Sequence, residues 1–405
     1  MTKDLSKLLA GGLRRLLAIQ SRIAVEAARG ARRHALHAKA PRHAAQTAVA
    51  DAVSEAVSQA ASEAAASAYP AREYVVRPVR QSRVGPRAAA WAAGEWRRAE
   101  HTVAATPLRA SRALPYGLYL PAGHAAAGLP LVVMLHGCRQ SMEAFAEGTR
   151  MNLLADLHGF AVVYPEQSAL VHPHQCWHWY DARDEAGGGE AAAVVSLVDA
   201  LVDEHSFDGS RVYLAGLSAG AGLAALLAVR APERFAAVAL HSGPAFGEAR
   251  SGVGALDVMR RGLYQDPVEL LERQLGDEAH PGMPAIVVQG EDDGVVAPIN
   301  AEQLTVQFLR LNGLADARGV RPGVASHEAA SEGHIVQDYA RRGASVVRLC
   351  RVANLDHAWS GGDDTVPFHS ATGPDASAMI WSFFKDHRRD AANDAFGGQL
   401  ARGAG

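Results

Sequence analysis

The sequence predicts an α/β fold in which a mostly parallel, doubly wound β-sheet is covered by helices on both faces. Several short runs are apolar at every position, as at residues 131–135, and such runs are typical of strands buried on both faces. Longer segments of helical character separate these runs. Strands that alternate with helices predict parallel pairing. We expect this domain to span residues 91–390.

The elements of this domain are expected in the following order. Two early strands cover about residues 96–103 and 113–120. The later strands, most of them apolar throughout, are expected at residues 131–135, 160–164, 212–214, 235–240, 285–289 and 345–352. Helices are expected up to about residue 157 and at 190–205, 219–230, 301–311 and 376–387. Residues 243–281 are a long insertion that is rich in glycine and then helical.

The two ends of the chain have a different character from the domain. Residues 1–70 predict an Ala-rich, basic, helical or partly disordered extension, and residues 71–90 a linker. Within residues 1–27, leucines at helical spacing predict an amphipathic helix with a basic flank. That helix could pack on protein, on the main domain or in an oligomer, or it could lie on a hydrophobic surface such as a polymer granule. Residues 391–405 predict a flexible tail.

Composition excludes several classes of protein. Residues 1–70 hold ten basic and five acidic residues, and the remainder holds 30 basic and 38 acidic residues. A mildly acidic main domain is not expected to bind nucleic acid. Three cysteines are too few for a disulfide scaffold, and no apolar run is long enough for a transmembrane segment. The N-terminus lacks the continuous apolar core of a secretory signal, so we expect a cytoplasmic protein.

A tight turn at residues 216–220 is the strongest chemical signal. Gly216-Leu-Ser-Ala-Gly220 lies between an apolar run and an Ala/Leu-rich helical segment. This pattern is typical of a nucleophile elbow, in which the serine hydroxyl stands at the tip and side chains at both glycines would clash. The alternative is a glycine-rich turn with an incidental serine. The strand before it and the helix after it favour the elbow.

A serine hydroxyl needs a base, and the base needs an acid that orients it. In folds of this type the acid and then the histidine follow the serine, each after a later strand. Gln289-Gly-Glu-Asp-Asp-Gly-Val-Val296 follows one expected strand and holds three acids. His357 follows the last expected strand and is flanked by Trp359 and two glycines. No phosphate loop, metal-ligand spacing or dinucleotide fingerprint is present, so neither cofactor nor metal is expected.

Residues 95–388 resemble the polyhydroxybutyrate (PHB) depolymerase family of α/β-hydrolase esterases, in the short-chain-length type of catalytic domain. The matching segments, in chain order, are Leu135-His-Gly-Cys-Arg-Gln140, Tyr164-Pro-Glu-Gln167, Cys176-Trp-His-Trp179, Gly216-Leu-Ser-Ala-Gly220, His241-Ser-Gly243, Gly290-Glu-Asp-Asp-Gly-Val-Val296, His357-Ala-Trp-Ser-Gly-Gly362 and Gly373-Pro-Asp-Ala-Ser377. Each segment alone is a weak signal, whereas the ordered set is specific.

The resemblance implies roles for particular residues. Ser218 is expected as the nucleophile and His357 as the general base. The family pattern of Gly, two residues, Asp, two residues, Val makes Asp293 the acid, with Asp292 as the alternative. Backbone N–H groups of Cys138 and Ala219 are expected to form the oxyanion hole. Gln289 and Asp356 depart from the family, which often has histidine and glycine there.

Further expectations concern the substrate and the surroundings of the site. The resemblance implies a serine esterase acting on poly(3-hydroxybutyrate) or short hydroxyalkanoate oligomers, with a feruloyl- or acetyl-type carbohydrate esterase as the alternative. A non-catalytic protein of the granule surface is the alternative from another class. Aromatic residues expected either to line the substrate pocket or to cover the sheet edge are Trp177, Trp179, Tyr180 and Trp359. The resemblance also implies proximity or a disulfide between Cys138 and Cys176, although a reducing cytoplasm disfavours the bond.

Overall fold

The computed structural model describes residues 92–103, 112–181, 187–277, 279–316 and 319–389. The predicted N-terminal extension, the linker and the C-terminal tail lie outside these residues. All of the described residues lie within the predicted main domain of residues 91–390.

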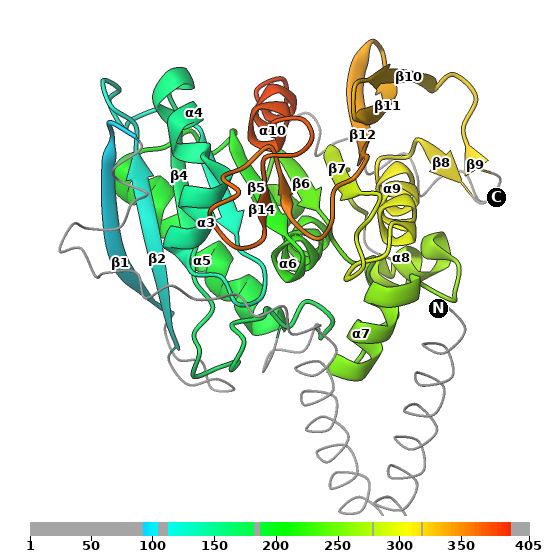
Figure 1. The fold of residues 1–405 in the computed structure, drawn as a ribbon, viewed down its shortest axis with the longest axis horizontal. Helices are drawn as coiled ribbons and strands as arrows, with labels where there is room; N and C mark the ends of the chain where they lie inside the picture. The colour runs from blue at the N-terminus through cyan, green and yellow to red at the C-terminus, as the bar shows by residue number, and fades with distance from the viewer. Residues whose placement is uncertain (1–91, 104–111, 182–186, 278, 317–318, 390–405) are drawn as a thin grey trace, which may run out of the picture. The chain divides into compact units, whose positions relative to one another are not determined.

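Ten strands of the described residues form one sheet with the order β1-β2-β4-β3-β5-β6-β7-β12-β11-β10 (Figure 1). Their bounds are β1 Glu95–Val103, β2 Arg112–Leu120, β3 Leu131–Leu135, β4 Ala161–Pro165, β5 Val212–Leu217, β6 Ala237–His241, β7 Ala285–Gly290, β10 Ala325–Ser331, β11 His334–Arg341 and β12 Ala344–Val352. The consecutive strands β4, β3, β5, β6, β7 and β12 pair in parallel, and the outer pairs are antiparallel. The prediction of a mostly parallel sheet is confirmed.

The parallel strands separate two apolar layers. Along β3, Leu131, Val133 and Leu135 face one layer, whereas Val132 and Met134 face the other. All five side chains are inaccessible to solvent. A strand buried on both faces needs apolar residues at every position, which is why these strands are continuous apolar runs in the sequence.

Helices cover both faces of the sheet. One layer contains α3 (Met142–Thr149), α4 (Met151–His158) and α10 (Ala376–Phe384), and the other contains α5 (Gly187–His205), α6 (Ala219–Arg230) and α9 (Ile299–Leu311). The insertion after β6 forms α7 (Gly252–Arg261) and α8 (Pro267–Leu275), and buried residues of both helices join the layer of α5 and α6, among them Val258 and Leu271. A short 3₁₀ helix spans Pro232–Arg234. The predicted doubly wound arrangement is therefore confirmed.

Local residues set several helix ends. The Ser141 hydroxyl accepts the N–H of Ala144 and caps α3, while the Asp266 carboxylate accepts N–H groups at the start of α8. Arg150 has a φ of 55° and separates α3 from α4. The sequence predicted one helical stretch here, and this left-handed residue divides it into two helices.

A hairpin at one end of the sheet was missed by the sequence analysis. β10 and β11 extend the sheet beyond β12 and stand at the upper right of Figure 1. Every side chain of β10 is exposed. Its sequence, ASHEAAS, has no apolar alternation and therefore gives little strand signal. Two small pairs, β8 (Ala315–Asp316) with β9 (Gly319–Val320) and β13 (Trp359–Ser360) with β14 (His369–Ser370), complete the described strands.

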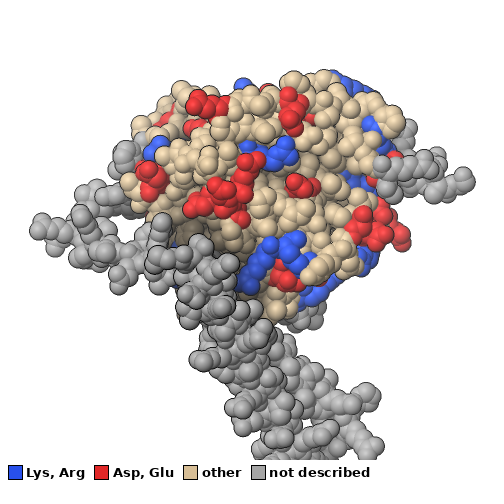
Figure 2. Space-filling view, turned by 45° about the vertical axis from the view of Figure 1, so that its right-hand side comes forward, with Lys and Arg blue, Asp and Glu red and all other residues tan. Residues whose placement is uncertain are grey.

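The described surface carries both signs of charge. Figure 2 shows acidic and basic side chains interspersed over one face of the molecule. Such a mixed surface differs from the single-sign basic stripe that is typical of nucleic-acid binding. Within the described ranges, no helix is both long and apolar enough to cross a membrane.

Candidate active site

Ser218 occupies a strained turn between β5 and α6. Its φ is 56° and its ψ is −119°, and its N–H donates to the carbonyl of His241 at 2.9 Å. A Cβ atom on Gly220 would lie 2.0 Å from the carbonyl oxygen of Leu135, and one on Gly216 would lie 2.4 Å from Gly220. Only glycine fits at either position, as the sequence predicted.

The side chain of Ser218 does not cap the helix that follows it. A serine at a helix N-terminus usually accepts a backbone N–H, yet Ser218 makes no such bond to α6. The residue is 5% exposed. The strained backbone therefore turns the hydroxyl away from the local structural role that this residue type ordinarily has.

An acid–base pair lies on two loops that follow neighbouring parallel strands. Asp293 follows β7, His357 follows β12, and His357 Nδ1 lies 2.8 Å from Asp293 Oδ2. The carboxylate can only accept, so Nδ1 carries the proton and Nε2 is left as the acceptor. The Asp293 side chain is fully buried, whereas that of His357 is 11% exposed.

Four donors surround the carboxylate of Asp293. Oδ1 accepts the N–H groups of Val295 and Val296 at 2.9 and 2.8 Å, and Oδ2 also accepts Gln289 Nε2–H at 3.2 Å. Burial alone raises the pKa of Asp293, but the hydrogen bond and charge of His357 and the two backbone donors outweigh it. The pKa of this carboxyl is therefore below its ordinary value, and the group is ionised at neutral pH.

The neighbouring acids point elsewhere. Glu291 and Asp292 are exposed, and the N–H of Asp292 donates to the carbonyl of Leu355 at 3.1 Å. A Cβ on Gly290 would lie 2.3 Å from that same carbonyl, so the two loops are in direct contact. The structure thus brings Asp293, rather than Asp292, to His357. Asp356 is exposed beside it.

The loop after β3 carries one of the two expected oxyanion donors, the N–H of Cys138, whereas Ala219 is the first residue of α6. Nε2 of the His136 ring accepts the N–H of Gln167 at 3.0 Å. Nδ1 of the same ring lies 2.7 Å from the carbonyl oxygen of Gly137. Burial lowers the pKa of His136 to about 4, so it is neutral. A Cβ on Gly137 would lie 3.5 Å from Cβ of Ser218. Among the described residues, none accepts a hydrogen bond from the N–H of Cys138 or Ala219.

A disulfide joins this loop to the loop that follows β4. Cys138 and Cys176 are bonded, with their Cα atoms 4.3 Å apart. Two hydrogen bonds join the same two loops. The N–H of Arg139 donates to the carbonyl of His174 at 2.7 Å, and Trp177 Nε1–H donates to the carbonyl of His136 at 3.0 Å. One disulfide and two hydrogen bonds therefore fix the loop of Cys138 to the loop after β4.

Three of the four aromatic residues expected either to line the substrate pocket or to cover the sheet edge are buried in the core. Trp177, Trp179 and Trp359 are all buried. Trp179 packs on Gly222 of α6, and Trp359 lies edge-on to Phe145. These rings belong to the two apolar layers of the core, and their lining of a substrate pocket stays a prediction. Tyr180 is half-buried beside Trp179.

The sequence analysis missed two buried polar groups near the site. His241 was part of a matching segment but received no role, although its backbone and ring contact the loops of Ser218 and His357. Glu190, expected only as the start of a helix, is buried and accepts from the ring and the backbone N–H of His178. A buried carboxylate beside a histidine fixes the loop after β4 to α5.

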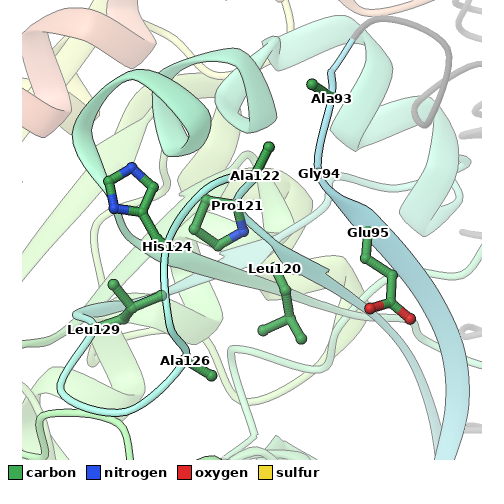
Figure 3. A pocket seen from close by; sticks show the side chains of 9 residues that line it. All are labelled: Ala93, Gly94, Glu95, Leu120, Pro121, Ala122, His124, Ala126 and Leu129. Atoms are coloured by element: carbon green, nitrogen blue, oxygen red, sulfur yellow. The ribbon is translucent and has the colours of Figure 1, made fainter.

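Two cavities lie away from this site. One cavity of about 480 Å³ is lined by Glu95 and His124, and none of the expected site residues lines it (Figure 3). Its remaining lining residues are Ala93, Gly94, Leu120, Pro121, Ala122, Ala126 and Leu129. The other, of about 620 Å³, lies at the opposite edge of the sheet from Ser218, beside the amino ends of β6, β7 and β12.

Comparison with protein families identifies the chain. A family model described as Esterase PHB depolymerase matches residues 114–331, more than half of the 405 residues. The chain belongs to this esterase family. The match includes the elbow serine, the loop of Cys138 and Asp293, while His357 lies beyond its end.

Relatives of this PHB depolymerase family member include proteins named as depolymerases and proteins named as feruloyl esterases. Poly(3-hydroxyalkanoate) depolymerase C of Paucimonas lemoignei is 35% identical over 48% of this chain and 48% of its own length. Feruloyl esterase B of Thermothelomyces thermophilus is 31% identical over 46% of this chain and 66% of its own length. The chain therefore matches between about half and two thirds of these two relatives.

A solved structure confirms the α/β-hydrolase fold. Acetyl xylan esterase from Aspergillus awamori is similar with a TM-score of 0.56 and 17% identity, over 71% of this chain and 99% of that chain. At this identity the likeness concerns the fold alone. The chain thus shares its overall fold with this structure.

Proposed function

We propose that this chain is a serine esterase that works through an acyl-enzyme, with Ser218 as nucleophile, His357 as base and Asp293 as the orienting acid. The observation that carries the proposal is the combination of an elbow serine that caps nothing with a histidine fixed by a buried carboxylate. Each role is one that such a residue performs in acyl transfer.

The acylation step begins at Ser218. Its Oγ attacks the ester carbonyl carbon while Nε2 of His357 accepts the hydroxyl proton. The carbonyl electron pair moves to oxygen, and that oxyanion accepts hydrogen bonds from the N–H groups of Cys138 and Ala219. The second N–H also lies at the N-terminus of α6, where negative charge is stabilised. The C–O bond then breaks, and His357 returns the proton to the leaving alcohol.

Deacylation repeats these steps with water. His357 Nε2 accepts a proton from water, whose oxygen attacks the acyl carbon, and the same two N–H groups hold the second oxyanion. Ser218 leaves with the proton from His357, and the carboxylic acid is released. Asp293 stays ionised throughout and stabilises the imidazolium that forms twice in each cycle.

The proposed substrate is poly(3-hydroxybutyrate) or its short-chain oligomers. Membership of the PHB depolymerase family and the depolymerase relative support this choice. A feruloyl- or acetyl-type carbohydrate esterase is the second candidate, and the named feruloyl and acetylxylan esterase relatives support it. The alternative from another class, a non-catalytic granule protein, has no use for the Asp293–His357 pair.

The location of the protein is a further proposal. We propose a cytoplasmic enzyme whose residues 1–27 attach it to polymer granules; these residues lie outside the described part of the chain. Disulfides seldom persist in a reducing cytoplasm, so the Cys138–Cys176 bond is in tension with this location. Alkylation of free thiols in intact producing cells would distinguish a reducing cytoplasm from an oxidising compartment. A fully oxidised pair in those cells would favour an oxidising compartment.

Product release is the direct test of the substrate. Purified protein is incubated with amorphous poly(3-hydroxybutyrate), with feruloylated arabinoxylan and with acetylxylan, and the released acids are quantified. We expect 3-hydroxybutyrate and its oligomers from the polyester, and no release by Ser218→Ala. Release of ferulate or acetate alone would select the carbohydrate esterase. Equal release by wild type and Ser218→Ala would refute the serine mechanism.

A further inference from the structure

We propose that His241 is a positioning residue that holds the Ser218 loop through its backbone carbonyl and the His357 loop through an uncharged imidazole, and so fixes their separation. This inference rests on the proposed esterase function, because it concerns how that same site is assembled. It assigns a task to a buried polar group that acyl transfer itself does not use.

His241 lies between the strands that carry the proposed catalytic residues. It is the last residue of β6, which pairs with β5 on one side and β7 on the other, and it is fully buried. Its carbonyl accepts the N–H of Ser218 at 2.9 Å. Its ring Nε2 accepts the N–H of Ser360 at 3.0 Å. One residue therefore connects the elbow to a position three residues after His357.

The hydrogen bond from Ser360 determines the protonation state of the ring. A backbone N–H can only donate, so Nε2 must be unprotonated and Nδ1 must carry the proton. Nδ1 lies 3.2 Å from Oγ of Ser242, which can accept that proton in a hydrogen bond. An imidazolium would place a second N–H against the N–H of Ser360. Burial, and then the charge of His357, lower the pKa of His241 to about 3, which keeps the ring neutral.

Packing makes a separate contribution. The ring of His241 stacks on Trp359, with centroids 4.9 Å apart and planes 21° apart. Trp359 is itself buried and donates from Nε1 to Oγ of Ser377. The residue thus offers an acceptor at Nε2 and a flat surface for stacking. Some substitutions remove the acceptor and keep the stacking surface, and others do the reverse.

Two variants separate the acceptor from the stack. His241→Phe keeps an aromatic ring on Trp359 but has no acceptor, whereas His241→Gln loses the ring and can place Oε1 near the former Nε2. Misplacement of reacting groups by about 1 Å can cost about 10²-fold in rate, so we expect kcat of His241→Phe to fall by roughly 10- to 100-fold. KM should stay within about twofold, because the change acts on geometry and not on ground-state binding.

His241→Gln should retain kcat within about fivefold, since it restores the acceptor for Ser360. His241→Asn is the matched control, because its shorter amide cannot reach that N–H and should behave like His241→Phe. A role in packing alone predicts the reverse order, with the phenylalanine variant near wild type and the glutamine variant impaired. That order would overturn the proposal. Melting temperatures of all three variants report whether any loss is a folding defect.

A measurement on the unaltered protein covers the case in which the variants do not fold. Nitrogen-15 NMR of histidine-labelled protein should show His241 as the Nδ1–H tautomer, without titration between about pH 5 and 9. A proton on Nε2, or titration in that range, would overturn the proposal. If the wild type hydrolyses no ester, the proposed function fails, but the NMR result still decides how His241 bonds.

Discussion

Replacing Asp293 by asparagine should disable the site through a change of tautomer. The carboxylate accepts four hydrogen bonds, two at each oxygen. An asparagine whose oxygen keeps the two backbone donors must turn its NH₂ group toward His357 and Gln289, and both of those atoms are donors. His357 can avoid this conflict only by moving its proton from Nδ1 to Nε2.

The expected loss follows from that move. A protonated Nε2 cannot take the proton of Ser218, so the base is present in the wrong form. Such a tautomer change lowers kcat by about 10³- to 10⁴-fold in a serine hydrolase. At about 1.36 kcal/mol per tenfold, this corresponds to roughly 4 to 5.5 kcal/mol of transition-state stabilisation. KM should change little, because Asp293 is buried behind the histidine.

The assay is hydrolysis of p-nitrophenyl butyrate, with circular dichroism to show that each variant is folded. Asp292→Asn is the matched control, because its side chain is exposed and we expect activity within about twofold of wild type. A larger loss in Asp292→Asn than in Asp293→Asn would refute the assignment of the acid. So would an Asp293→Asn enzyme that keeps a tenth of its kcat.

Three further outcomes are expected. Gly220→Ala should destabilise the fold by about 3 kcal/mol or more in urea unfolding, because the new Cβ meets the carbonyl of Leu135, while Gly209→Ala, whose nearest neighbour is 3.7 Å away, should have little effect. Thiol titration under non-reducing conditions should find one thiol in the unfolded protein and none in the native protein, since Cys350 is buried and its pKa is raised to about 12. Three thiols after unfolding would exclude the disulfide. Deletion of residues 1–70 should leave hydrolysis of soluble esters nearly unchanged but abolish co-sedimentation with polymer granules. Equal pelleting of both proteins would assign that segment to packing or oligomerisation.

Much of the fold could be predicted because its signals are local. Buried parallel strands require unbroken apolar runs, and the elbow requires glycine on both sides of Ser218. The acid and the histidine could be ordered along the chain because loops after parallel strands meet at one edge of the sheet. The β10–β11 hairpin lacked such a signal, since an exposed strand is under no pressure to carry apolar residues.

The surroundings of the site could not be predicted in the same way. Tryptophans beside a catalytic motif serve equally well as pocket walls or as core, and the sequence does not show that Trp177, Trp179 and Trp359 are all buried. The role of His241 depends on Ser360, which lies 119 positions away along the chain. Contacts of this kind leave no periodic pattern, because each involves a single pair of residues brought together by the completed sheet.

The backbone at Ser218 limits which nucleophiles evolution can place there. A positive φ is tolerated by an unbranched side chain when neighbouring structure enforces it, but a β-branched residue is a severe outlier in this region. The close approach of Gly216 to Gly220 supplies that enforcement. A cysteine could therefore replace the serine without moving the main chain, and would turn the site toward thiol chemistry. A threonine also offers a hydroxyl, but its branched Cβ would strain the backbone of this turn.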